Sequence, residues 1–187
     1  ATAALPPPRN PADTLDGVED TAIDNGLPVV VMRADALGIR GTESPAEHEA
    51  DDARRTRLES IRLRAGRLMQ LGDVTDTTVP KLTMVSAPTA GGDISTRTFI
   101  PHRCHEAIGV FGAVSVATAA LLPGTPAADV TRPGAGADGM LTCEHPTGTF
   151  TAAIEVDADG DAPVVRRAGI IRTARKLMDG TVFPAEY

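Results

Sequence analysis

An uncharged segment at residues 107–122, AIGVFGAVSVATAALL, is the feature that most constrains the fold. As a helix it would be apolar or small on every face, and such a helix in a soluble protein must be surrounded by protein on all sides. Glycines, alanines and a serine recur along it, so neighbouring elements can approach closely. It is shorter than the ~20 apolar residues that a membrane span requires. We therefore expect a buried central helix enclosed by a curled sheet, and no membrane span.

Residues 44–71, SPAEHEADDARRTRLESIRLRAGRLMQL, carry the clearest signals for another helix. Ser44 suits the N-cap and Pro45 the first helical position, while acids come early and arginines late, as the helix dipole favours. The apolar residues at roughly helical spacing are Leu58, Ile61, Leu63, Leu68 and Met69. This pattern predicts one amphipathic outer helix whose arginines lie on a solvated face.

Strand and turn signals fill most of the remaining chain. The predicted β segments are DTAIDNGLPVVVM at 20–32, VPKLTMVSAP at 79–88, DISTRTFI at 93–100, MLTCEHPTGTFTAAIEV at 140–156 and VVRRAGIIRTARKLMDGTVF at 164–183. Turns are expected at Asn25-Gly26, at TAGG (89–92), at HPTG (145–148) and at Asp179-Gly180. The fold class is therefore α+β, with a mostly antiparallel sheet.

Charge and cysteine content exclude several classes of function. The formal net charge is −7 and the sequence pI about 5.0, whereas nucleic acids and anionic membranes require clustered excess cations. The two cysteines, Cys104 and Cys143, have neither zinc-site nor redox-dithiol spacing, which favours a reduced, cytoplasmic protein. The proline-rich start predicts a connector at 1–16 that leads into one lobe at 17–187.

A polar cluster, Pro101–Glu106 (PHRCHE), directly precedes the apolar segment. A helix N-terminus has free N–H groups and a positive dipole end, which bind anions, and His102, Arg103 and His105 would add donors there. This favours an anion pocket at the mouth of the buried helix. Three alternatives remain open at this point: helix capping with a structural ion pair, a metal on His102, Cys104 and His105, and Cys104 as a nucleophile.

Several blocks in a fixed order resemble a known family. DGVEDTAIDNGLPVVVM, LGDVTDTTVPKLTMVSAP, STRTFIPHRCHEAIGVFGAVSVATA and RTARKLMDG are similar to the C-terminal half of 4-oxalomesaconate tautomerases, within the PrpF family of isomerases. The similarity runs from about Leu5 to about Phe183, with a variable patch at 124–142. It therefore covers nearly the whole chain.

The resemblance implies a diaminopimelate-epimerase-like fold of two lobes, each a curled sheet around a central helix, with the active site between them. In the family a lysine and a cysteine of the N-terminal lobe move the proton, without cofactor or metal. Neither the CGN motif of that cysteine nor the lysine is in this chain. The second catalytic cysteine of the related epimerases matches about Ile108, which has no ionisable group. No catalytic residue is therefore expected here, and the N-terminal lobe is the expected partner.

The resemblance also implies a substrate-binding role for residues that would face the other lobe: Asn25, Lys81, Ser95, Arg97, His102, Arg103 and His105. The implied activity is a cofactor-independent isomerase that acts by proton transfer on an unsaturated keto polycarboxylate; both oxalomesaconate and methylaconitate-like acids fit. Two alternatives are a non-catalytic carboxylate-binding module and an assembly module, and a homo-oligomer is compatible with each.

Overall fold

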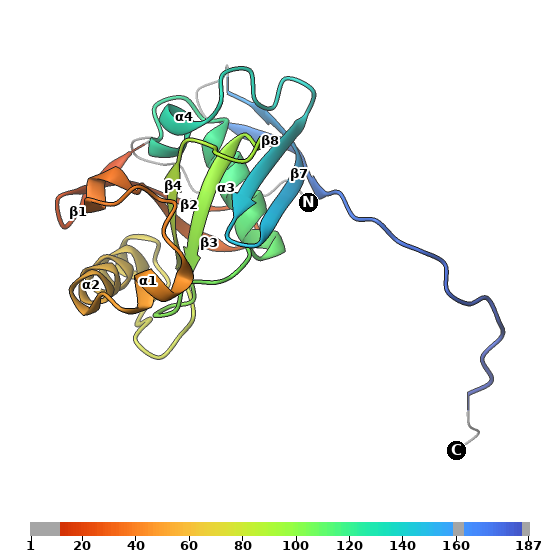
Figure 1. Cartoon of the computed structure of the whole chain (residues 1–187), viewed down its shortest axis with the longest axis horizontal. Helices are drawn as coiled ribbons and strands as arrows, with labels where there is room; N and C mark the ends of the chain where they lie inside the picture. The colour runs from red at the N-terminus through yellow and green to blue at the C-terminus, as the bar shows by residue number, and fades with distance from the viewer. Residues whose placement is uncertain (1–11, 159–162, 185–187) are drawn as a thin grey trace.

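The computed structural model describes residues 12–158 and 163–184, and in this part of the chain one eight-stranded sheet forms the framework (Figure 1). The spatial order of the strands follows the chain, β1 to β8. Their bounds are β1 Asp13–Leu15, β2 Val18–Asp24, β3 Pro28–Arg33, β4 Lys81–Ser86, β5 Ile94–Phe99, β6 Met140–His145, β7 Gly148–Asp157 and β8 Val164–Ile170. The sheet thus begins before the lobe boundary expected at residue 17, and the connector's first eleven residues lie outside the described part.

Two pairs of strands, β3–β4 and β5–β6, are parallel, and the other neighbouring pairs are antiparallel. A parallel pair needs a crossover connection, usually helical, and each of these pairs is joined by one. The first crossover contains η1 Asp35–Leu37, α1 Pro45–Glu49 and α2 Asp52–Leu68; the second contains α3 Val110–Ala120 and α4 Pro126–Val130. The predicted α+β class and mostly antiparallel sheet are confirmed.

Helix α3 is the buried central helix that the apolar segment predicts. Residues 112–120 are all buried, and the core around them draws on β2, β3, β4, β5, β6 and β7. The helix is shorter than expected, because Gly109 is its extended N-cap and residues 107–108 belong to the preceding loop. Enclosure also fails at the first turn, where Phe111 is 60% exposed. Within the described residues, no helix combines the length and apolar character needed to span a bilayer.

Helix α2 covers the opposite face of the sheet. Its Leu58, Ile61 and Ala65 pack in a second core with residues such as Met32 and Phe99. Ser44 is the N-cap as predicted, in a capping box with Glu47. The single expected helix is nevertheless split into α1 and α2, because Asp51 caps a new helix start by accepting a hydrogen bond from the Arg54 N–H.

The predicted division of α2 into an apolar stripe and a solvated face is wrong at two positions. Leu68, assigned to the apolar stripe, is 59% exposed. Arg62, assigned to solvent, is fully buried and ion-paired to Glu59 at 2.7 Å. Its guanidinium also donates to the carbonyls of Val74, Thr75, Thr77 and Val79. A buried guanidinium is tolerated because these acceptors replace its hydration, and Arg62 thereby holds the loop that leads into β4.

The C-terminal segment departs most from the sequence prediction. β8 forms, but residues 171–184 are neither strand nor turn, and Asp179-Gly180 does not make the expected hairpin. Figure 1 shows this segment running away from the body of the protein. A lone two-stranded hairpin is at best marginally stable without a surface to pack on, which accounts for the missing turn.

Candidate functional site

One end of the sheet gathers several polar loops, and we call it the loop end: residues 24–27, 100–109 and 145–148. The register brings them together, because Val29 pairs with Lys81 and Leu82 pairs with Phe99, so β3 and β4 begin where β5 stops. β6 runs parallel to β5 and ends at the same side. Helix α3 also begins there, since a Cβ on Gly26 would lie 3.3 Å from the Phe111 ring.

Asn25 holds the β2–β3 turn against α3. Its Nδ2 donates to Thr118 Oγ1 at 2.9 Å, and its backbone N–H donates to Ser115 Oγ at 3.2 Å. The Ser115 hydroxyl donates in turn to the carbonyl of Leu27. Gly26 follows with φ 96°, a left-handed conformation that glycine adopts without strain. Asn25 therefore lies at the loop end, and its side-chain NH₂ donates a hydrogen bond to α3.

Lys81 lies at the start of β4, close to the loop end. By strand alternation it is on the same face as Val85, which belongs to the core around α3. Burial, followed by the positive charge of Arg62, lowers the pKa of Lys81. Both effects disfavour the ammonium form, and an anion placed beside this half-buried lysine would favour it.

Ser95 and Arg97 face the other side of the sheet. On β5, Ile94 belongs to the core around α3 and Phe99 to the core around α2, so odd-numbered positions point towards α2. Arg97 is buried, and its guanidinium donates to the carbonyls of Glu43 and Thr96, each at 2.8 Å. The structure therefore does not bring these two residues to the mouth of α3.

His102 and Arg103 lie at the loop end, but their side chains turn towards α1 and α2. The Ile100 N–H donates to the Arg103 carbonyl, and Phe99 bridges to Cys104, so the chain folds back tightly after β5. His102 Nδ1 is 3.7 Å from a carboxylate oxygen of Glu59, and Arg103 Nε is 3.2 Å from Glu49. The expectation that both residues line the mouth of α3 is not met. Arg103, at 82% side-chain exposure, is instead paired as the ion-pair alternative proposed.

His105 remains near the start of α3, and His145 joins it from the β6–β7 turn. His105 Nδ1 accepts a hydrogen bond from the Ala107 N–H at 2.9 Å. The N–H and hydroxyl of Thr147 both donate to the Glu106 carbonyl, and Thr147 Oγ1 is 3.3 Å from His145 Nδ1. Burial lowers the pKa of His145, and the charges of His105 and Arg97 act in the same direction. These effects outweigh two backbone hydrogen bonds that raise the pKa of His145, so its neutral form is favoured.

Sequence reasoning missed His145 and Thr147 because HPTG (145–148) was interpreted only as a turn. The available signal was His145 itself, at the predicted turn. Only the pairing of β5 with β6 shows that this histidine lies near His105. That pairing places residue 145 next to residues 105–106, although about forty positions separate them in the chain. A single sequence does not specify such a pairing.

The two cysteines are not reactive groups in this structure. Both are buried and free. Burial raises the pKa of Cys104 to about 11 and that of Cys143 to about 12, so both are protonated thiols at neutral pH and poor nucleophiles. Across the described part of the chain, no three His, Cys, Asp or Glu side chains are grouped to hold a metal ion.

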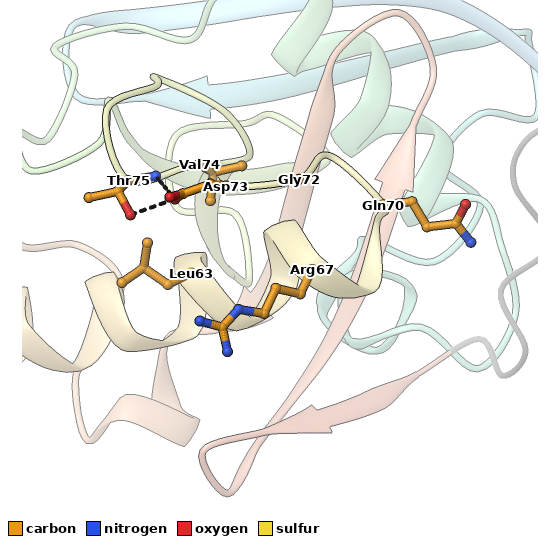
Figure 2. A pocket seen from close by; sticks show the side chains of 7 residues that line it. All are labelled: Leu63, Arg67, Gln70, Gly72, Asp73, Val74 and Thr75. Carbon is orange, nitrogen blue, oxygen red and sulfur yellow. Dashed lines mark hydrogen bonds between the residues drawn. The ribbon is translucent and has the colours of Figure 1, made fainter.

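A hollow of about 560 Å³ lies elsewhere, beside the C-terminal half of α2 (Figure 2). It is lined by Leu63, Arg67, Gln70, Gly72, Asp73, Val74 and Thr75. Figure 2 shows Asp73 facing Thr75, whose N–H and hydroxyl donate to its carboxylate at 3.0 and 2.7 Å. None of the residues assigned to substrate binding lines this hollow.

The loop end has the chemistry to hold an anion. Its groups are the first-turn N–H groups of α3, which have no intrahelical acceptors, together with His105, His145 and Lys81. Ile108, buried just before α3, has no ionisable group. The arrangement can neutralise a carboxylate, and its imidazoles and Lys81 are the groups at the loop end that can accept or donate a proton.

Comparison with solved structures defines the class of fold. The chain superposes on methylitaconate-delta-isomerase with a TM-score of 0.74 at 20% identity, covering 88% of this chain and 49% of that one. It superposes on a hydroxyproline epimerase from Agrobacterium vitis with a TM-score of 0.51 at 15% identity, covering 87% and 45%. The fold is therefore the diaminopimelate-epimerase-like α+β fold, as the resemblance implied.

The chain belongs to the PrpF family: residues 1–184 match the family described as PrpF protein. It is 51% identical over 180 residues to (4E)-oxalomesaconate Delta-isomerase of Novosphingobium sp. (strain KA1), covering 96% of this chain and 50% of that protein. It is 50% identical to 4-oxalomesaconate tautomerase of Pseudomonas putida, covering 96% and 48%, and 40% identical to putative isomerase YbhH of Escherichia coli (strain K12), covering 97% and 51%. The chain spans about half the length of these relatives.

Proposed function

We propose that this chain is the substrate-binding lobe of an isomerase that moves a proton on an unsaturated keto polycarboxylate such as 4-oxalomesaconate. The observation that carries the proposal is the identity of about half of all residues, over 96% of the chain, with two proteins named for that substrate. The non-catalytic alternative has less support, because the named relatives are isomerases.

The chemistry assigned to this lobe is electrostatic. Isomerisation breaks a C–H bond adjacent to the conjugated system and returns the proton to another carbon, through a dienolate with delocalised negative charge. Groups already oriented towards that charge stabilise it without reorganising. Lys81, His105 and the N-terminus of α3 are suited to this role at the loop end, and we add neutral His145 as a hydrogen-bonding group.

The acid–base groups are assigned to the half of the protein that is not in this chain. The two thiols here are buried and protonated, and Ile108 occupies the place of a catalytic cysteine in the related epimerases. The relatives are about twice as long as this chain, which leaves room for a second, N-terminal lobe. We further propose that the reaction requires no cofactor and takes place in the cytoplasm.

The other assigned residues are proposed to act less directly. Asn25 fixes the turn beside α3, and Arg97 ties the end of the 38–44 loop to β5 through the Glu43 carbonyl. Arg103 contributes positive potential at the rim of the loop end while paired to Glu49 of α1, and His102 lies beside Glu59 of α2. Ser95, buried on the α2 side, supports β5.

The test is a chimera that places the remaining half of the Novosphingobium relative ahead of residue 1. Loss of the ultraviolet absorbance of the conjugated keto acid reports turnover of 4-oxalomesaconate. We expect turnover, and His105→Ala should raise KM about tenfold or more, as expected for loss of a hydrogen bond to a charged group. Arg132→Ala is the matched control. It breaks an ion pair to Asp93 that lies outside the loop end, so KM should stay unchanged. A folded chimera that turns over neither this acid nor methylaconitate-like acids contradicts the proposal.

A further inference from the structure

Phe111, in the first turn of α3, is an exposed aromatic residue on a helix that is otherwise largely buried. Residues 112–120 are all buried, whereas Phe111 is 60% exposed. Side chains of a helix tilt towards its N-terminus, so a side chain in the first turn projects past the start of the helix. Phe111 therefore places an aromatic ring at the loop end, beside the first-turn N–H groups that have no intrahelical acceptors.

The β2–β3 turn holds this ring in place. A Cβ on Gly26 would lie 3.3 Å from Cδ1 of Phe111, and the φ of 96° at Gly26 also suits glycine. Asn25 ties the same turn to α3 through hydrogen bonds to Ser115 and Thr118. A single exposed phenylalanine is ordinary on a protein surface. Here one edge of the ring packs against a turn that is fixed to the same helix, and the rest of the ring stays open.

Groups that attract anions share this end of the lobe with the ring. Lys81 begins β4 on the α3 face of the sheet. His105 Nδ1 accepts a hydrogen bond from the Ala107 N–H, which leaves Nε2 as a donor. The face of a phenylalanine ring carries partial negative charge and stacks on flat π-systems in offset arrangements. A ligand that fits both surfaces has carboxylates for the donors and planar, uncharged carbon atoms for the ring.

We propose that Phe111 is a specificity-determining residue whose ring stacks on the conjugated carbons of the substrate, and so favours planar, unsaturated polycarboxylates over saturated ones. The inference rests on the proposed function in taking the loop end as the substrate site. The conjugated carbons of an unsaturated keto acid lie in one plane, and the dienolate formed from it extends that plane. A saturated acid of the same charge has tetrahedral carbons and offers no flat face. The ring therefore discriminates by the double bond, while the carboxylates supply binding that both acids share.

The test uses two tricarboxylates that differ by one double bond, planar trans-aconitate and saturated tricarballylate. Calorimetry on the chimera described above gives the ratio of their dissociation constants without requiring turnover. Phe111→Leu keeps an apolar side chain and removes the flat ring. It should reduce the preference for trans-aconitate about 2- to 12-fold, the loss expected for one aromatic stack, and leave the affinity for tricarballylate unchanged. Phe111→Tyr retains the ring and should retain the parent ratio. Leu68→Ala, at an apolar residue equally exposed on α2, is the matched control and should also retain it.

Three results would overturn the inference: an unchanged ratio in Phe111→Leu, an equal loss of affinity for both acids, or a folded chimera that binds neither acid. Urea unfolding adds another, because a lower midpoint of Phe111→Leu with an unchanged ratio would make the other half of the chimera the partner of the ring. Turnover separates the two proposals. A reduced preference in a chimera that does not turn over 4-oxalomesaconate refutes the proposed function alone, whereas turnover with an unchanged ratio refutes this inference alone.

Discussion

Asp20 is a buried carboxyl group whose ionisation should control the stability of this lobe. It is 1% exposed, in the middle of β2, and neither of its oxygens has a hydrogen-bond partner within the described structure. Asp13 lies directly opposite on β1, and Met32 lies opposite on β3. Burial, followed by the charge of Asp13, raises the pKa of Asp20 from 3.8 to about 7. The folded protein therefore holds this carboxyl protonated well above the pH at which the unfolded chain ionises it.

The size of the effect follows from linkage between protonation and folding. At about 1.36 kcal/mol per pKa unit, a rise from 3.8 to about 7 corresponds to roughly 4 kcal/mol. Because the folded-state pKa is the higher one, this stability is fully present below about pH 4 and is lost as the pH rises through 7. The contribution of Asp20 thus makes the protein less stable at pH 8 than at pH 5.

The substitution that tests this is Asp20→Asn, which keeps the shape and removes the titration. Urea unfolding between pH 4.5 and 8.5 should show that the variant gains stability relative to the parent as the pH rises, by about 3 kcal/mol over this range. Glu19→Gln, at the exposed neighbouring position of β2, should leave the pH dependence of the parent unchanged. Parallel stability curves for the parent and Asp20→Asn would refute the reasoning.

Other perturbations probe packing and reactivity. Arg62→Leu should lower the free energy of unfolding by about 3 kcal/mol or more, since Glu59 and several carbonyls lose their buried partner. Arg64→Leu removes an exposed ion pair and should lower it by under about 1 kcal/mol. Equal losses in thermal unfolding would contradict the burial argument. Gly92→Ala should lower the free energy of unfolding by about 1–3 kcal/mol because its Cβ would lie 2.6 Å from Glu144. Gly169→Ala, where a Cβ meets open space, should leave the stability unchanged. A Gly92→Ala variant as stable as the parent would show that the contact with Glu144 is not tight. A disulfide reagent should modify neither thiol before unfolding, so reaction of the native protein would contradict their burial.

The parts of the fold that the sequence predicted correctly are those with a single physical solution. An uncharged helix such as 110–120 can only be buried, whatever its neighbours are. The β2–β3 and β4–β5 hairpins follow from hydrophobic runs bounded by turn residues. Ser44 caps α1 directly before Pro45, as the local sequence predicts. Each of these features depends on residues close in sequence or on burial alone.

The parts that sequence reasoning placed wrongly depend on partners far away in the chain. Arg62 resembles its solvated neighbours until the 74–79 carbonyls surround it. Arg103 was assigned to the mouth of α3, whereas the fold-back after β5 turns it towards Glu49, more than fifty residues earlier. Opposite charges on two unconnected segments attract only after the sheet has placed those segments side by side. The composition of the cluster was therefore informative, while its direction was not.

The topology also explains why the assigned residues divide as they do. Because each parallel strand pair sends its crossover to a different face, the sheet is covered by α3 on one side and by α2 on the other. Successive residues of a strand then belong to different cores, so Ser95 and Arg97 cannot share a site with groups on the α3 face. Only positions where strands end are free of this alternation. A ligand of this lobe should consequently be held at strand ends and turns, by Lys81, His105 and His145 of the loop end. A row of side chains along β5 could not hold it.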